Sequence, residues 1–92
     1  MTKSLGVLCI GGLQTHQENH AAGFDSDSRS HIVAVADEAD IDERRRLLNQ
    51  GLAEQYGVPY IEGIERALAL PEVDIVSMCA DVERRHRVAA AC

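Results

Sequence analysis

The chain has 92 residues, a length that predicts one domain or part of one, with a modest hydrophobic core. Its net charge of −6, from 15 acidic and 9 basic residues, argues against a nucleic-acid partner, because phosphate binding needs Lys and Arg clustered on one face. No apolar run approaches the roughly 20 residues that span a bilayer, and the first residues lack a signal-peptide pattern. We therefore expect a cytoplasmic protein with no membrane partner.

Two apolar runs stand close together near the start of the chain. The first, Leu5–Ile10, stops at Gly11 and Gly12, and the second, His31–Ala36, ends on Asp37. Unbroken apolar runs are typical of strands buried on both faces of a parallel sheet, and the polar segment between them is long enough for the crossover that a parallel pair needs. Glycines after one strand and a carboxylate after the next are the layout of a dinucleotide-binding βαβ unit.

The middle of the chain continues this alternation. A first helix is expected within residues 12–24, followed by a surface loop over residues 25–30. The clearest helix begins at a capping box formed by Asp40 and Glu43, and it ends before Gly57. Its apolar stripe consists of Ile41, Leu47, Leu48, Leu52 and Tyr56.

Three further elements are expected after this helix. Residues 58–61 form a short strand, which Pro59 places near a sheet edge or at a strand start. A short helix over residues 63–70 and an apolar strand over residues 74–79 follow, and a last helix begins at Asp81.

The order β-α-β-α-β-α-β-α predicts an α/β fold, a doubly wound parallel sheet of Rossmann type with about four strands. The last helix has no cap or breaker before Cys92. We therefore expect residues 1–92 to be a partial dinucleotide-binding domain, with a C-terminal substrate domain absent from this chain.

Glycines at a dinucleotide site let backbone N–H groups approach the pyrophosphate beside a helix N-terminus. Gly11 and Gly12 supply the turn. The second and third glycines of G-x-G-x-x-G are missing, whether the count starts from the first or the second of these. The residues in their places are Leu13 and His16, or Gln14 and Gln17, respectively.

Asp37 is the stronger indication of a cofactor site. It ends a fully apolar strand, where a bare carboxylate has no packing use and is able to accept hydrogen bonds from ribose hydroxyls. The acidic pair of Asp37 and Glu38 would repel a 2′-phosphate, so we expect NAD rather than NADP. A role as a helix-capping or turn carboxylate is the alternative for Asp37. The segment 14–16 is expected to contact ligand phosphates or substrate.

No group of residues predicts a metal site. His16 and His20 are four residues apart but have no third ligand at suitable spacing, and they are expected to be polar surface residues. The cysteines, Cys9, Cys79 and Cys92, form no C-x-x-C pair. We expect them to be reduced, buried thiols without a metal or catalytic role.

Three segments resemble the N-terminal domain of the glucose–fructose oxidoreductase and inositol dehydrogenase family (Gfo/Idh/MocA). They are Val33–Asp37, Ala53–Pro59, and Pro71–Val76 followed by His86. The resemblance implies NAD(P) binding in a Rossmann domain, with sugars, inositols or related polyols oxidised or reduced in a second, α+β domain. It also implies association into homo-oligomers through that second domain.

The resemblance further implies contacts with the cofactor. Its pyrophosphate loop would consist of Gly11, Gly12, Leu13, Gln14 and Thr15. Asp37 would be the ribose carboxylate, and Cys79 and Ala80 would lie beside the nicotinamide-proximal ribose. The chain departs from the family where Ala80 and Asp81 replace a Thr-Pro pair, and it lacks the Glu-Lys-Pro motif that carries the active-site lysine.

The sequence thus predicts the NAD-binding part of an oxidoreductase that transfers hydride between a nicotinamide cofactor and a sugar, inositol or related polyol. These 92 residues hold no catalytic proton-transfer residue, so the chain alone is expected to be inactive. The alternative is a non-catalytic Rossmann module with a degraded glycine loop, acting as a nucleotide sensor or scaffold. A different Rossmann ligand, such as a nucleotide-sugar or an adenosyl compound, also stays open.

Overall fold

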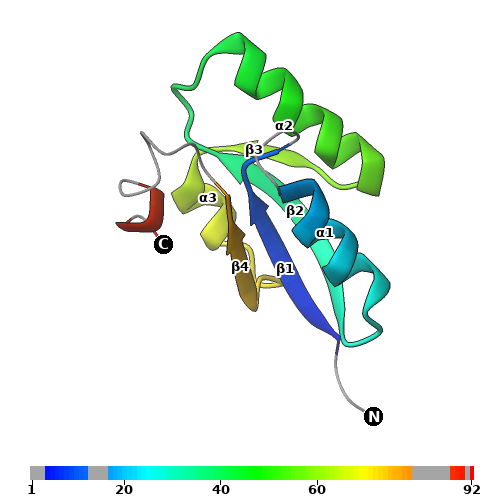
Figure 1. Ribbon diagram of the computed structural model, residues 1–92. Helices are drawn as coiled ribbons and strands as arrows, with labels where there is room; N and C mark the ends of the chain where they lie inside the picture. The colour runs from blue at the N-terminus through cyan, green and yellow to red at the C-terminus, as the bar shows by residue number, and fades with distance from the viewer. Residues whose placement is uncertain (1–3, 13–16, 80–87, 91) are drawn as a thin grey trace.

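The computed structural model describes residues 4–12, 17–79, 88–90 and 92. Within them, four parallel strands form one sheet in the order β3-β2-β1-β4, and helices alternate with the strands (Figure 1). This confirms the predicted α/β fold, a Rossmann-like parallel sheet. The elements are β1 (Leu5–Ile10), α1 (Gln17–Ser26), β2 (Ser30–Asp37), α2 (Glu43–Tyr56), β3 (Tyr60–Glu62), α3 (Ile64–Leu68) and β4 (Ile75–Met78).

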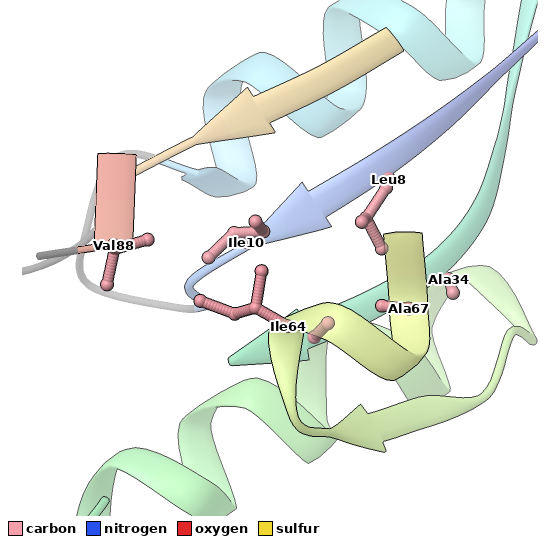
Figure 2. Close-up of a cluster of buried hydrophobic side chains, with 7 residues drawn as sticks. Leu8, Ile10, Ala34, Ile64, Ala67 and Val88 are labelled. Carbon is pink, nitrogen blue, oxygen red and sulfur yellow. The ribbon is translucent and has the colours of Figure 1, made fainter. Parts of the chain in front are cut away.

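Helices cover both faces of the sheet, because β1 and β2 are apolar on both sides and alternate residues of a strand point to opposite faces. The core on the face of α1 and α2 contains Val7, Cys9, Ala21, Ile32, Val35, Leu52 and Ala53. The core on the face of α3 contains Leu8, Ile10, Ala34, Ala36, Ile64, Ala67 and Val88 (Figure 2). The sheet is therefore doubly wound, as predicted.

The start of α2 differs from the predicted capping box. Asp42, with φ −71° and ψ 165°, is the N-cap, and its Oδ1 accepts a hydrogen bond from the backbone N–H of Arg45 at 2.9 Å. The prediction that Asp40 caps this helix is wrong, because Asp42 has the extended backbone and the carboxylate within reach of the first turn. The other end is confirmed: Gly57 has φ 65° and donates its N–H to the carbonyl of Glu54.

The buried face of α2 also differs from the predicted stripe. Ile41 is buried but precedes the helix, and Leu47 is 57% exposed. The buried residues are Asn49, Leu52 and Ala53, whose spacing of three and four is that of one helix face. One member of this face is polar.

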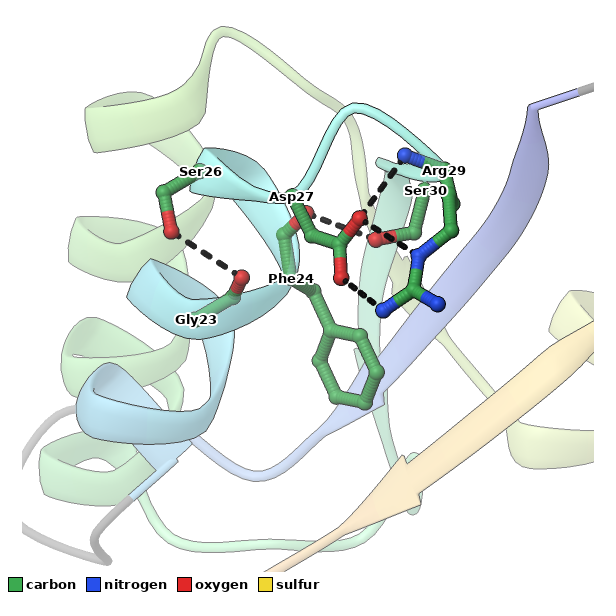
Figure 3. A network of polar contacts seen from close by, with 6 residues as sticks. All are labelled: Gly23, Phe24, Ser26, Asp27, Arg29 and Ser30. Carbon is green, nitrogen blue, oxygen red and sulfur yellow. Dashed lines mark hydrogen bonds and ion pairs between the residues drawn. The ribbon is translucent and has the colours of Figure 1, made fainter.

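Helix α1 extends into the predicted loop, so the loop is only a turn over residues 27–29. The carboxylate of Asp27 holds this turn (Figure 3), accepting from the backbone N–H of Arg29 at 2.9 Å and from its guanidinium at 2.8 and 3.1 Å. These hydrogen bonds lower the pKa of Asp27 to about 2. The Ser30 hydroxyl donates to the carbonyl of Phe24 at 2.7 Å, closing the connection to β2.

The predicted elements of the second half are present, with shorter bounds. β3 is an edge strand that follows Pro59 directly, as that proline predicts. The predicted helix over 63–70 is reduced to α3, and the strand over 74–79 to β4. Residues 88–90 are helical, whereas the predicted helix start at Asp81 lies outside the described residues.

No helix in the described part of the chain is long enough and apolar enough to cross a membrane.

Candidate functional site

The candidate site lies at the carboxyl edge of the sheet, where all four parallel strands end together. Backbone hydrogen bonds join the ends of β2, β1 and β4: Gly11 N–H donates to the Ala36 carbonyl at 3.2 Å, and Cys79 N–H donates to the Ile10 carbonyl at 2.9 Å. The structure therefore brings Gly11, Asp37 and Cys79, which follow or end three different strands, to one edge. Ligands of doubly wound sheets bind outside this edge.

The glycine turn after β1 has two separate reasons for its composition. Gly11 has φ 94°, a backbone conformation that favours glycine. Gly12 is buried, and a Cβ there would lie 2.5 Å from Oδ1 of Asn49 and 2.7 and 2.8 Å from that residue's Cα and N. Helix α2 therefore packs closely enough on Gly12 to exclude a side chain.

Asp37 ends β2 with its side chain almost wholly covered, at 1% exposure. Its Oδ1 accepts from the Glu38 backbone N–H at 2.8 Å, and its Oδ2 accepts from Nδ2 of Asn49 at 3.1 Å. Its backbone carbonyl accepts from the Gly63 N–H at 2.9 Å. The bond to Glu38 is the turn role named as the alternative for Asp37, while the position at the strand end is the one expected of a ribose carboxylate.

A pocket of about 330 Å³ opens beside Asp37, between the segment after β2 and the start of α3. Three carboxylates and one guanidinium are among its side chains, so its lining is net acidic. The lining residues are Glu38, Ala39, Asp40, Gly63, Ile64, Glu65 and Arg66.

Two site residues were not predicted from the sequence, Asn49 and Gln17, and both are buried amides. Asn49 is 2% exposed and joins α2 to Asp37, and it also lies 3.4 Å from the hydroxyl of Tyr60. Burial raises the pKa of Tyr60, and the charge of Asp37 adds to that increase. The signal in the sequence was a polar residue in register with Leu52 on the buried face of α2.

Gln17 is the first residue of α1 and is 0% exposed. Its Nε2 donates to the carbonyls of Ile10 and Ser77, at 2.8 and 2.6 Å, and its Oε1 accepts from the Ser77 hydroxyl at 3.0 Å. The signal here was its place in the sequence, since it occupies the third glycine position counted from Gly12.

The three thiols differ in their exposure to solvent. Cys9 is buried, as predicted, but Cys79 is half-buried and Cys92 is exposed, so the prediction of three buried thiols is wrong. Cys9 points into the core from a strand interior, whereas Cys79 and Cys92 lie outside regular strands. His20 is exposed on α1, and the described residues contain no group of three or more metal-ligating side chains.

Four of the eight predicted cofactor residues lie outside the described residues: Leu13, Gln14, Thr15 and Ala80. The same is true of His16 and His86. The other four, Gly11, Gly12, Asp37 and Cys79, stand at the carboxyl edge.

The crystal structure of GenD2 from gentamicin A biosynthesis, in complex with NAD, is similar to this chain. The match has a TM-score of 0.80 at 27% sequence identity, and it covers 99% of this chain and 24% of GenD2. This chain has the fold of that part of GenD2. No protein-family model matches the sequence, and no curated protein matches it.

The match to GenD2 extends over both the carboxyl edge and the covering helices, because nearly the whole chain is aligned. The chain spans about a quarter of the length of GenD2. The likeness therefore concerns the sheet and its edge, and not the remaining three quarters of that protein.

Proposed function

We propose that this chain is the NAD-binding part of an oxidoreductase of the Gfo/Idh/MocA kind, which transfers hydride to or from a sugar, inositol or related polyol. The observation that supports the proposal most is the placement of Asp37 beside the Gly11–Gly12 turn. The chain also has the fold of part of GenD2, at 27% sequence identity, and GenD2 was crystallised in complex with NAD. A nicotinamide cofactor supplies the hydride chemistry, and the protein supplies binding and orientation.

The residues at this edge fit a dinucleotide in their chemistry. Asp37 is an acceptor at the position where ribose hydroxyls donate, and Gly11 provides a tight turn before α1. One adjustment is needed, because Asp37 is 1% exposed and its Oδ2 is held by Asn49. A ribose hydroxyl therefore reaches the carboxylate when the Asn49 side chain turns away from it.

The electrostatics of the adjoining pocket favour NAD over NADP. The pocket lining has three acidic residues, Glu38, Asp40 and Glu65. Its one basic residue is Arg66. A 2′-phosphate placed there would meet three like charges, and close like charges repel. This agrees with the expectation drawn from the pair Asp37 and Glu38.

The proposal is tested by titrating NAD and NADP into the 92-residue protein by calorimetry, with Asp37→Asn alongside. Losing a charged hydrogen-bond acceptor costs about 1.5–3 kcal/mol, so NAD affinity should fall by about tenfold or more in the variant. The matched control is Asp74→Asn. The Asp74 carboxylate also accepts from a backbone N–H, that of Gly6 at 2.8 Å, but at the opposite edge of the sheet. The Asp74→Asn variant should therefore leave NAD affinity unchanged.

The substrate class needs a separate measurement, on a protein that contains this chain together with a substrate domain. Inositols and aldose sugars are compared by following NADH formation. Turnover of simple primary alcohols with none of the polyols would contradict the substrate part of the proposal while leaving NAD binding intact.

A non-catalytic Rossmann module is the second candidate, and the contact between Asn49 and Gly12 favours it. That contact explains the glycine without a ligand, and the partners of Asp37 explain its burial without a ribose. If the folded wild-type protein binds neither NAD nor NADP at millimolar concentration, this candidate replaces the oxidoreductase.

A further inference from the structure

The side chain of Gln17 joins one helix to two strands. Its amide nitrogen donates to the carbonyl of Ile10 on β1 and to that of Ser77 on β4, and its amide oxygen accepts from the Ser77 hydroxyl. The hydroxyl thereby fixes which end of the amide faces the two carbonyls. With 0% exposure, the side chain is a fully buried polar group whose donors and acceptor are all used.

The place where Gln17 makes these bonds is the switch point of the sheet. α1 and α2 pack on one face and α3 packs on the other, and the two sets diverge between β1 and β4. In doubly wound sheets the ligand binds in the crevice at this point, outside the carboxyl ends of the strands. The Gln17 amide connects Ile10, the last residue of β1, to β4. Ile10 is itself paired with Met78 of β4.

Gln17 also stands where the fingerprint requires its third glycine, counted from Gly12. That glycine permits close packing between the helix and the strand. In this chain a long side chain occupies the position, and its hydrogen bonds attach α1 to both strands. Where the third glycine is missing, the side chain of Gln17 attaches α1 to the sheet.

We propose that Gln17 is a positioning residue for the dinucleotide. By fixing the first residue of α1 against β1 and β4, it holds the N-terminus of that helix in place for the pyrophosphate in the absence of the third glycine. This inference rests on the proposed function. It assigns no chemistry to Gln17 itself, which acts through the position of α1.

The test compares NAD with AMP in the 92-residue protein carrying Gln17→Glu. AMP contains the adenosine end, which Asp37 would hold, while NAD adds the rest of the pyrophosphate and the nicotinamide riboside. The carboxylate of the variant faces two carbonyl oxygens and loses the two donated bonds, so α1 should shift from the switch point. We expect NAD affinity to fall about tenfold and AMP affinity to change less than about twofold.

Two further variants keep the result interpretable. Ser77→Ala removes only the hydroxyl that orients the amide, and it should lower the ratio of NAD affinity to AMP affinity about twofold to threefold. Gln55→Glu makes the same chemical change at an exposed position of α2 and should leave the ratio unchanged. It controls for the added negative charge.

The outcomes separate the inference from the proposed function. If wild-type protein binds NAD and the NAD-to-AMP ratio is the same in Gln17→Glu and Ser77→Ala, Gln17 only stabilises the fold and the inference is wrong. If the folded wild-type protein binds neither ligand, the proposed function fails and the inference fails with it. A ratio lowered in both variants and unchanged in Gln55→Glu supports the inference.

Discussion

Nδ2 of Asn49 lies 3.1 Å from Oδ2 of Asp37, and these two residues are 1–2% exposed. This hydrogen bond joins the middle of α2 to the carboxyl end of β2. It also explains how a carboxylate remains buried at the end of an apolar strand, since a buried charge needs hydrogen-bonded partners. The Asn49–Asp37 pair therefore belongs to the ligand-free fold, and a ribose that binds Asp37 has to replace it.

Asn49→Ala should lower the free energy of unfolding by about 1–3 kcal/mol, because the buried Asp37 carboxyl group loses a hydrogen-bond donor. Urea denaturation monitored by circular dichroism measures the change. Asn19→Ala, at an exposed position of α1, is the matched control and should have little effect. An unchanged free energy of unfolding in Asn49→Ala would show that water or another group replaces the amide at no cost.

The same variant should bind NAD more tightly, by about fivefold, if the ribose replaces the Asn49 amide on Asp37. A ligand that must displace an internal partner loses that part of its binding free energy, and removing the partner restores it. Calorimetric titration of the folded variant measures this. Weaker NAD binding would instead mean that Asn49 itself contacts or orients the cofactor.

Gly12→Ala should destabilise the protein by about 1–3 kcal/mol, because the new methyl group overlaps α2. Two of the three close atoms, at 2.7 and 2.8 Å, are the Cα and N of Asn49. Truncating that side chain leaves both of them in place. The double variant Gly12→Ala with Asn49→Ala should therefore show no rescue, and a recovery of stability would locate the conflict in the side chain alone.

The sequence was sufficient to predict the strands but not the contacts among the polar residues. β1 and β2 are buried on both faces, so their unbroken apolar runs identify them directly. Gly57 was equally predictable, because a left-handed residue after a helix favours glycine. Each of these depends on local chemistry alone.

The Gln17 and Asn49 amides depend on residues distant in sequence, and for that reason the pattern could not predict them. The partner of Gln17 on β4 is 60 residues away, and Asp37 is 12 residues from Asn49. The choice between Asp40 and Asp42 as the N-cap depended on backbone geometry, since both precede the helix with suitable side chains. The role of Asp37 could not be decided from the sequence, because this residue makes a turn contact and also stands at the end of a strand.

Two glycines outside the site should respond in opposite directions to alanine. Gly23→Ala, in α1 with nothing near its Cβ position, should stabilise the protein by about 0.5–1 kcal/mol, because alanine loses less conformational entropy in a helix. Gly6→Ala would overlap the carbonyl oxygen of Glu72 and the side chain of Val33, and should destabilise strongly. Thermal unfolding of both variants compares them, and equal melting temperatures would contradict the close approach at Gly6.

Cys9 should stay unreactive towards iodoacetamide at mildly alkaline pH, while Cys92 is modified. The thiolate is the reactive form, and burial, with a smaller contribution from Cys79, raises the pKa of Cys9 from 9.0 to about 11. Desolvation also raises the pKa of Cys92, but this thiol is exposed and therefore accessible to the reagent. Mass spectrometry of digested, labelled protein gives the rate at each site, and labelling of Cys9 at the rate of Cys92 would contradict its burial.

The same pKa shift makes stability depend on pH in a defined direction. Below pH 9 the thiol is protonated in both the folded and unfolded states, so its contribution to stability is fully present. Above pH 9 the unfolded chain loses this proton while the folded protein keeps it up to about pH 11, so the free energy of unfolding falls as pH rises through this range. Cys9→Ala should flatten that decline relative to wild type, and an identical decline in both proteins would assign it to other groups.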